Sequence, residues 1–272
     1  MNTTAEKRAK FRELHNSGCF VLPNPWDIGS ARMMQHLGFE AIATTSSGLA
    51  WTVGRPDYAI TMDDVLEHLM ALEENTELPI NADFESGFAR APETLAANVD
   101  LVIDTGVAGF SIEDRDLDST DQLYEQPLAA ERIKAAREAI DHSGSDVILV
   151  ARTERLLIDP TAVREATDTL VALAAAGADC LYAPGVRERK DISAMVRAVY
   201  PKPLNVLAMD TTMTVSEFAD LGVRRISVGG SLARVGWSAM LEAAKQIKSG
   251  SFAGLAKGAS AGDLNKVFGT FA

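Results

Sequence analysis

Residues 161–185 read TAVREATDTLVALAAAGADCLYAPG, a helical pattern followed by a short apolar run. Apolar residues recur at the period of an amphipathic helix as far as Ala176. Gly177 then stands where the helix is expected to end, because glycine accepts the left-handed backbone of a helix C-cap. The same turn recurs as DTGVAG at 104–109 and as DLGVRR at 220–225. The chain therefore repeats one helix–turn–strand unit.

Such units follow one another along the whole chain. The predicted strands are 19–24, 40–45, 79–85, 109–114, 146–153, 179–185, 204–209 and 224–230. The predicted helices include 61–74, 92–104, 129–142, 161–176 and 231–248. Strands of nearly continuous apolar content, separated by helices, pair in parallel with the helices outside. Eight units predict an α/β protein with a (β/α)8 TIM barrel, and a doubly wound open sheet is the alternative.

The length of 272 residues suits one such barrel. No Pro/Ser-rich linker interrupts the chain, so we expect a single domain over 1–272. Helical sequence continues past the eighth unit and carries Phe252, Phe268 and Phe271. We expect these aromatic side chains to be buried, either under the barrel or on a neighbouring subunit.

The net charge of −12, with no basic stripe, argues against nucleic acid and anionic membrane surfaces as partners. No run approaches the roughly 18 apolar residues that span a bilayer. The first 15 residues form an amphipathic pattern without the apolar core of a signal peptide. Cys19 and Cys180 are too few for a disulfide framework or a zinc site. We therefore expect a protein of the reducing cytoplasm.

Acidic side chains gather at the predicted ends of the strands. Asp83 and Glu85 point the same way because strand side chains alternate, and Glu113 closes the next strand. Asp57, in a loop after the second strand, can join them. Clustered carboxylates repel unless a cation neutralises them, and oxygen ligands select Mg²⁺, or Mn²⁺. The alternative is a structural ion-pair network with Arg55, Arg115 and Arg152.

Other polar groups at the strand ends suit an anionic substrate. Arg152 can grip a carboxylate or phosphoryl group through two parallel hydrogen bonds, or neutralise Glu113. The loop 44–50 offers hydroxyls and backbone N–H groups to an oxyanion. Residues 229–231 form either a phosphate site or only a tight turn. The histidines and lysines all lie away from strand ends, so the chemistry must rely on a Lewis acid rather than a Schiff base.

Six motifs occur in one order along nearly the whole chain: Asn24-Pro25-Trp26-Asp27, Thr45-Ser46-Ser47-Gly48, Gly54-Arg55-Pro56-Asp57, Asp83-Phe84-Glu85-Ser86-Gly87, Ile112-Glu113-Asp114 and Ala151-Arg152-Thr153. This order resembles the isocitrate lyase/phosphoenolpyruvate mutase superfamily. The resemblance implies a Mg²⁺-dependent barrel that makes or breaks C–C or C–P bonds of small 2-oxo or 2-hydroxy acids. It also implies a homotetramer, or a dimer, in which C-terminal helices of about 231–272 lie at the interface and can be swapped between subunits.

The resemblance assigns roles to particular residues. Asp83 matches the most direct metal ligand, and Glu85, Glu113 and the outer-shell Asp57 complete the metal set. The substrate-binding set that it implies is Ser46, Ser47, Gly48, Leu49, Arg152 and, by a looser match, Asn205.

The loop 115–125 departs from the superfamily, because it lacks the Lys-Lys-Cys-Gly-His motif of the lyases and the lysine of the mutases. Arg152 and Glu113 remain as catalytic candidates, with Tyr124 or Asp116 as the acid/base and Tyr182 as a further option. We expect a Mg²⁺-dependent lyase that cleaves a C–C bond of a small 2-hydroxy or 2-oxo dicarboxylic acid through a metal-stabilised enolate. Two alternatives are C–P chemistry, as a phosphonopyruvate mutase or hydrolase, and a non-catalytic barrel that binds a metal and an oxo acid.

Overall fold

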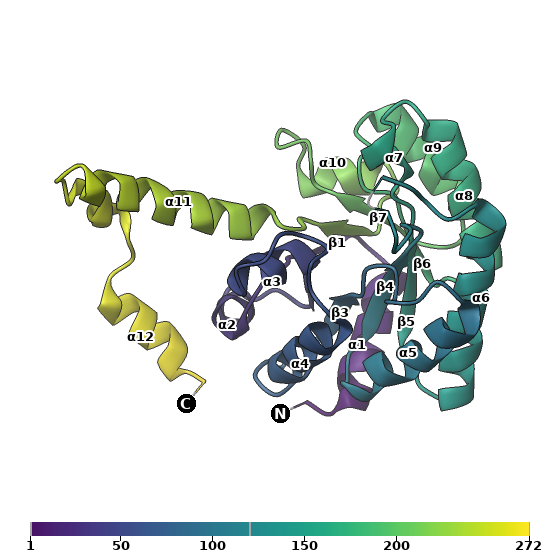
Figure 1. The fold of residues 1–272 in the computed structure, drawn as a ribbon, viewed down its shortest axis with the longest axis horizontal. Coiled ribbons are helices and arrows are strands. Elements are labelled where there is room, and N and C mark those ends of the chain that lie inside the picture. Colours follow the sequence, from purple (N-terminus) through teal and green to yellow (C-terminus); the bar gives the residue numbers. More distant parts are fainter. Residues whose placement is uncertain (1, 120, 272) are drawn as a thin grey trace.

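Parallel strands form the centre of the computed structural model, which describes residues 2–119 and 121–271 (Figure 1). The eight strands are β1 (Phe20–Leu22), β2 (Ile42–Ala43), β3 (Ile80–Asp83), β4 (Gly109–Glu113), β5 (Ile148–Arg152), β6 (Cys180–Tyr182), β7 (Leu204–Leu207) and β8 (Arg225–Ser227). Their order β1-β8-β7-β6-β5-β4-β3-β2 brings the first strand beside the last. The (β/α)8 barrel is thereby confirmed, and the open doubly wound sheet is excluded.

The barrel has a seam between β1 and β2. Among the described residues these two strands share no ladder of paired residues, whereas β1 pairs with β8 over three residues. Ala43 N donates to the Pro23 carbonyl across the seam at 3.0 Å. The Asn24 side chain adds a hydrogen bond to the Thr44 carbonyl at 2.8 Å. The barrel is therefore nearly, but not fully, closed by backbone pairing.

Helices surround the strands, and all five predicted helices are confirmed. The helices are α1 (Thr4–Asn16), α2 (Ile28–His36), α3 (Ser46–Thr52), α4 (Met62–Glu73), α5 (Pro92–Asp104), α6 (Gln126–Ser143), α7 (Arg155–Ile158), α8 (Val163–Ala175), α9 (Arg189–Val199), α10 (Val215–Asp220), α11 (Ser231–Lys248) and α12 (Ala261–Gly269), with a 3-10 turn η1 (Ala253–Lys257). Gly177 has a φ of 112°, as its predicted place after a helix requires. None of the described helices is long and apolar enough to cross a membrane.

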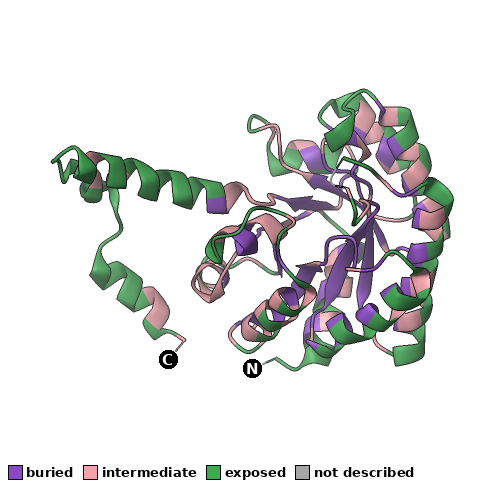
Figure 2. Cartoon of the chain, in the orientation of Figure 1, coloured by how far each residue is buried: buried purple, intermediate pink, exposed green. Residues whose placement is uncertain are grey.

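Apolar side chains form two separate clusters. Figure 2 shows that the buried residues are concentrated on the strands and on parts of the helices around them. The larger one lies between the strands and the surrounding helices. The smaller one fills the barrel interior and includes Phe20, Leu22, Val150 and Tyr182. Phe11 of α1 belongs to this inner cluster, so α1 supplies an apolar side chain to the end of the barrel where the strands begin. The opposite end is left to polar side chains.

The C-terminal helices leave the barrel. Figure 1 shows α11 projecting away from the strands, while α12 returns toward α2. The exposed large apolar residues of α11 and η1 are Val235, Trp237, Met240, Leu241, Ile247 and Leu255. Phe252 is also exposed, whereas Phe268 and Phe271 are half-buried, with Phe271 stacked against Arg32. Phe252 is therefore not buried under the barrel, as one form of the prediction required. Its burial on a neighbouring subunit, the other form, stays a prediction.

Candidate active site

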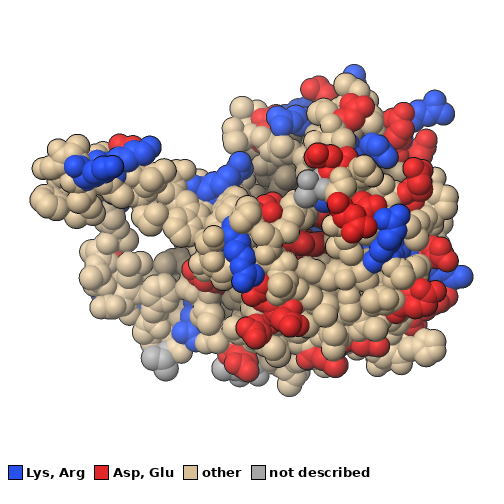
Figure 3. All heavy atoms as spheres, in the orientation of Figure 1, with Lys and Arg blue, Asp and Glu red and all other residues tan. Residues whose placement is uncertain are grey.

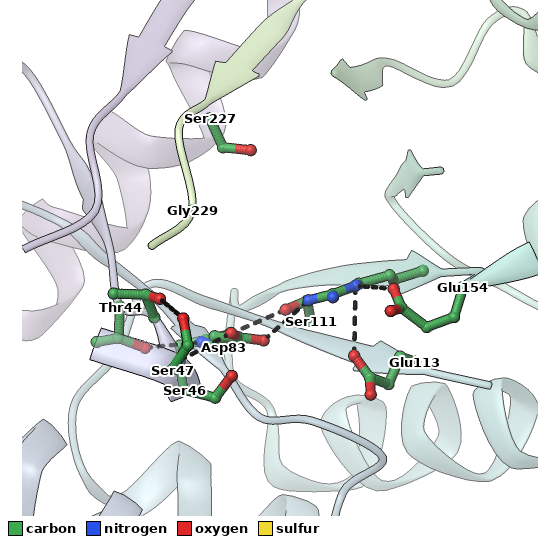
Figure 4. A network of polar contacts seen from close by, with 12 residues as sticks. Thr44, Ser46, Ser47, Asp83, Ser111, Glu113, Glu154, Ser227 and Gly229 are labelled. Atoms are coloured by element: carbon green, nitrogen blue, oxygen red, sulfur yellow. Dashed lines mark hydrogen bonds and ion pairs between the residues drawn. The ribbon is translucent and has the colours of Figure 1, made fainter. Parts of the chain in front are cut away.

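The carboxyl ends of β3, β4 and β5 carry the central residues of the site. In the strand register Asp83 lies opposite Ser111, and Glu113 lies opposite Arg152. Because strand side chains alternate, Asp83, Glu113 and Arg152 all face the barrel interior at its C-terminal mouth. Figure 4 shows Asp83, Glu113 and Glu154 around one set of ion pairs, with Ser227 and Gly229 of the β8 end on the other side of the pocket. The structure thus places the predicted Asp83, Glu113 and Arg152 together at one end of the barrel.

Arg152 lies at the centre of this group. Its Nη1 is 3.3 Å from Asp83 Oδ1, and its Nε is 3.3 Å from Glu113 Oε2 and 2.5 Å from Glu154 Oε1. Despite burial, the charges of Glu154, Glu113 and Asp83 raise the pKa of Arg152. The guanidinium therefore stays charged and acts as the local counter-ion of three carboxylates.

A second arginine supports the same acids from the loop after β4. Arg115 Nη2 lies 3.1 Å from Glu154 Oε2, and its Nε lies 3.7 Å from Glu113 Oε1. Although burial opposes ionisation, Arg152 and Arg115 lower the pKa of Glu154. Glu113 has the opposite behaviour, since burial raises its pKa well above the ordinary value. Arg55, by contrast, pairs with Asp64 outside this group at 2.5 Å.

Asp57 and Glu85 extend the cluster toward the loop after β2. Ser46 links Asp57 to Asp83, because its backbone N–H donates to Asp83 Oδ2 at 3.0 Å and its hydroxyl donates to Asp57 Oδ1 at 3.4 Å. Partial desolvation and the charge of Asp83 raise the pKa of Asp57. Burial, followed by the charges of Asp83 and Asp57, raises the pKa of Glu85 to about 8.

These acids outnumber the arginines, and among the described residues two of their buried oxygens have no hydrogen bond. Five acids stand against two arginines, namely Asp57, Asp83, Glu85, Glu113 and Glu154 against Arg115 and Arg152. Glu85 Oε1 and Glu113 Oε1 are buried without a hydrogen bond. Surplus carboxylate oxygen of this kind fits a hard divalent cation. In the part of the chain that is described, no three or more acidic, His or Cys side chains form a preformed metal cage. A hydrated Mg²⁺ is compatible with this, because it keeps several of its waters.

The loop predicted to hold the substrate carboxylate becomes the start of α3. Thr45 is its N-cap, and its hydroxyl accepts from Gly48 N at 3.4 Å. A side chain at Gly48 would meet Thr45 Cγ2 at 2.6 Å and Trp26 Cβ at 2.9 Å, so only glycine fits there. Leu49 is turned into the core. The amide of Ser46 is already bonded to Asp83, which leaves Ser47 as the least engaged member of the predicted set.

Asn205 and Gly229 occupy the other side of the pocket. Asn205 is fully buried and bonds Arg225 and Ser227, below the mouth of the barrel. Asn24 Oδ1 accepts from the amides of Val228 and Gly229 at 2.9 and 2.8 Å. Two amides that a phosphate would need are thus taken, and the geometry of 229–231 is that of a tight turn.

The two predicted acid/base residues of the loop 115–125 lie away from the acids. Tyr124 is buried in the outer apolar cluster, with its ring 4.4 Å from the Arg132 guanidinium. Asp116 Oδ2 binds Arg90 Nη1 at 2.7 Å. The structure therefore does not bring Tyr124 or Asp116 to the carboxylates at the strand ends.

Three residues of the site were missed from the sequence. Glu154 follows Arg152 by two positions, and strand alternation could have placed both on one face. Arg132, 1% exposed, donates to the carbonyls of Glu113, Ser86 and Ala89 and so anchors the loops after β3 and β4. Tyr58 has a φ of 63°, and its ring lies 4.8 Å from the Arg115 guanidinium. No sequence signal pointed to Arg132 or Tyr58.

A narrow cavity of about 40 Å³ lies among these groups and is lined by Asn24, Thr44, Asp83, Arg152, Tyr182 and Gly229. One wall carries Asp83 and Arg152, and the other presents the hydroxyl of Thr44 and the amide of Asn24. Arg152, Asp83 and a small polar cavity lie at the C-terminal mouth, which is where the active site of a barrel enzyme is found.

Comparison with known proteins agrees with that class. The family model for phosphoenolpyruvate phosphomutase matches residues 11–248. The chain therefore belongs to this family, within the isocitrate lyase/phosphoenolpyruvate mutase superfamily of lyases and mutases, and it is an enzyme. The predicted superfamily resemblance is confirmed.

Individual relatives cover most of the chain. Oxaloacetate decarboxylase of Pseudomonas aeruginosa is 31% identical over 235 residues, which is 82% of this chain and 79% of that protein. A Burkholderia cenocepacia protein described as a lyase/mutase is 39% identical with a TM-score of 0.94, over 98% of both chains. Oxaloacetate acetylhydrolase, solved with its product oxalate, is 25% identical with a TM-score of 0.87, over 99% of this chain and 96% of that one.

Proposed function

We propose that this enzyme is a divalent-cation-dependent lyase that cleaves a C–C bond of a small 2-oxo or 2-hydroxy dicarboxylate, with oxaloacetate as the first candidate. The observation that carries the proposal is the acid-rich mouth, where Arg152 and Asp83 line a small cavity, and where Glu85 and Glu113 each keep a buried oxygen without a hydrogen bond among the described residues. The similarity to an oxaloacetate decarboxylase and an oxaloacetate acetylhydrolase supports this substrate class.

Each group at the mouth has a role in this proposal. Asp83 would be the most direct ligand of Mg²⁺, or Mn²⁺, and Glu85, Glu113 and Asp57 would contribute largely through water bound to the cation. The cation would supply a Lewis acid that polarises the 2-oxo group. With the acids neutralised, Arg152 could bind a substrate carboxylate through two parallel hydrogen bonds, and Ser47 could add a hydroxyl. These contacts orient the C–C bond that breaks and exclude water from the small cavity.

A second candidate is C–P bond chemistry, which the phosphomutase family model supports. The turn at 229–231 weighs against it, because Asn24 already holds the amides of Val228 and Gly229. The lysine expected for a mutase is also missing from the loop 115–125.

Isothermal titration with oxalate, an enolate mimic, tests the proposal. We expect oxalate to bind only with Mg²⁺, and binding to be lost in Asp83→Ala but kept in Asp63→Ala, an exposed acid of α4. Turnover of oxaloacetate then separates the two candidates. Absence of oxalate binding in both metal conditions would mean that the carboxylates are structural, and phosphate release from phosphonopyruvate would favour C–P chemistry.

We also propose that α11 and α12 contact a second copy of this chain in a dimer or tetramer. The exposed Val235, Trp237 and Met240 support this, and Figure 3 shows that most of α11 in that view is neither acidic nor basic. Sedimentation of the parent and of Trp237→Glu tests it, and a monomeric parent at micromolar concentration would exclude it.

The free Cys19 and Cys180 are compatible with a reducing compartment such as the cytoplasm.

A further inference from the structure

Arg225 is a buried cation without an acidic partner. It lies on β8, is 2% exposed, and lines the cavity together with Asn81, Ser227 and Tyr182. Its Nε donates to Asn205 Oδ1 at 2.8 Å, and its Nη1 donates to Asn81 Oδ1 at 3.1 Å and lies 3.5 Å from His15 Nε2. No described carboxylate forms an ion pair with Arg225. A guanidinium held in this way fixes the orientation of its neutral partners, because it can only donate hydrogen bonds.

The orientation passes from Arg225 to Ser227. Since Arg225 donates, the Asn205 carbonyl oxygen must face it, and the Asn205 amide nitrogen must face away. That nitrogen donates to Ser227 Oγ at 3.0 Å. Ser227 Oγ is thus an acceptor toward Asn205, and its hydrogen is free to donate elsewhere. Ser227 and Tyr182 line the same cavity, so this hydrogen can be donated to the Tyr182 hydroxyl.

His15, on the other side of Arg225, is also oriented by a neighbour that can act in only one way. His15 Nδ1 lies 2.7 Å from the Phe11 carbonyl, which can only accept. His15 therefore carries its hydrogen on Nδ1, and Nε2 is left as an acceptor toward Arg225. Burial, followed by the charge of Arg225, lowers the pKa of His15 to about 3, so the ring is neutral. The hydrogen bonds from Arg225 to Asn205 and from Asn205 to Ser227 therefore run toward the mouth, and the hydrogen bond from His15 to the Phe11 carbonyl runs toward α1.

Tyr182 ends the network at the cavity. It lines the cavity with Asp83 and Arg152, and its ring is 5.3 Å from the Arg152 guanidinium. Burial raises the pKa of Tyr182, so the phenol keeps its hydrogen at neutral pH. When the Tyr182 oxygen accepts from Ser227, the phenol hydrogen is left to point into the cavity.

We infer that Tyr182 is the proton donor of the lyase reaction and that Arg225 is a positioning residue, acting through Asn205 and Ser227. This inference rests on the proposed function. For oxaloacetate, the C3–C4 bond breaks, CO₂ leaves, and the electron pair stays as the enolate of pyruvate. The Tyr182 hydroxyl gives its proton to C3, which yields pyruvate, and the phenolate regains a proton from water. The donor is thus on β6, whereas the sequence pattern favoured the loop 115–125.

Exchange of the pyruvate methyl hydrogens in D₂O measures this proton transfer without turnover of oxaloacetate. We expect Tyr182→Phe to slow Mg²⁺-dependent exchange, followed by proton NMR, by about a hundredfold or more. Oxalate affinity should change by less than about threefold, since the mutation removes no charge. Unchanged exchange, or oxalate binding weakened as much as exchange, would overturn the assignment. A parent protein that neither binds oxalate nor exchanges pyruvate would instead overturn the proposed function.

Asn205→Asp tests the positioning role of Arg225. The new carboxylate pairs with Arg225 and accepts from Ser227, so Ser227 no longer donates to Tyr182 and the Tyr182 hydrogen turns away from the cavity. We expect exchange to fall about tenfold or more while the melting temperature is kept or raised, a combination that a merely structural role would not give. Asn81→Asp is the matched control, because it places the same charge beside Arg225 and at the lining of the same cavity, but outside the path from Asn205 through Ser227 to Tyr182. Full exchange in Asn205→Asp, or an equal loss in Asn81→Asp, would overturn the positioning role.

Discussion

The two ends of the barrel interior hold their charges in opposite ways. At the mouth, five acids surround two arginines, and two buried carboxylate oxygens accept no hydrogen bond from the described residues. Below it, Arg225 is a lone cation whose partners are neutral amides and a neutral histidine. The mouth is incomplete without a cationic ligand, whereas the floor is complete as it stands. We infer that binding and reaction occur at the mouth and that the floor fixes orientation.

Among the changes predicted here, removal of Arg152 should lower the free energy of unfolding most. Arg152→Met leaves the buried acids Glu113 and Glu154 without their main counter-ion, so we expect the free energy of unfolding to fall by about 3–5 kcal/mol. Urea denaturation without metal measures it. Arg55→Met is the control, since the exposed Arg55–Asp64 pair is expected to contribute less than about 1 kcal/mol. Equal losses in the two variants would contradict the view that the acids depend on Arg152.

A smaller, pH-dependent loss of stability should come from His15, which lies beside Arg225. The folded-state pKa of His15 is lowered to about 3, while the unfolded chain titrates near 6.5, so the unfolded state binds more protons between these values. Stability is therefore fully present above pH 6.5 and falls as the pH drops toward 3. We expect His15 to account for about 2 kcal/mol of the loss between pH 6.5 and 5.

Urea denaturation at pH 7 and pH 5 checks the contribution of His15. In His15→Gln that part of the loss should disappear, whereas His142→Gln, at an exposed position, should behave as the parent does. If the parent and His15→Gln lose the same stability on acidification, the neutral floor is not the reason for the acid sensitivity.

The smallest effect is expected in the loop after β4. Asp116 pairs with Arg90, whose side chain is 55% exposed, so Asp116→Asn should lower the free energy of unfolding by less than about 1 kcal/mol. Turnover of oxaloacetate should change by less than about threefold, because the carboxylate faces Arg90 rather than the cavity. Steady-state kinetics measures it, and a hundredfold loss would return Asp116 to the role of acid/base.

The strands and the acidic mouth were predictable because they depend on local signals. Alternating apolar runs and C-cap glycines such as Gly177 fix the helix–strand units, and the strand ends of a barrel meet at one mouth. The contacts of Tyr124 and Arg225 were not predictable. Tyr124 is turned outward by packing against Arg132, and the partners of Arg225 come from β3, β7 and α1. Such contacts join distant segments, and no local pattern records them.

The seam between β1 and β2 bears on how the protein is made. The ladder partner of β1 is β8, so residues 20–22 cannot complete their pairing until residues 225–227 have left the ribosome. Asn24, which reaches both Thr44 and the amides after β8, is likewise in place only after that event. The cavity is thus assembled only after β8 has been made, and a nascent chain carries its acidic residues long before it has a closed site in which to use them.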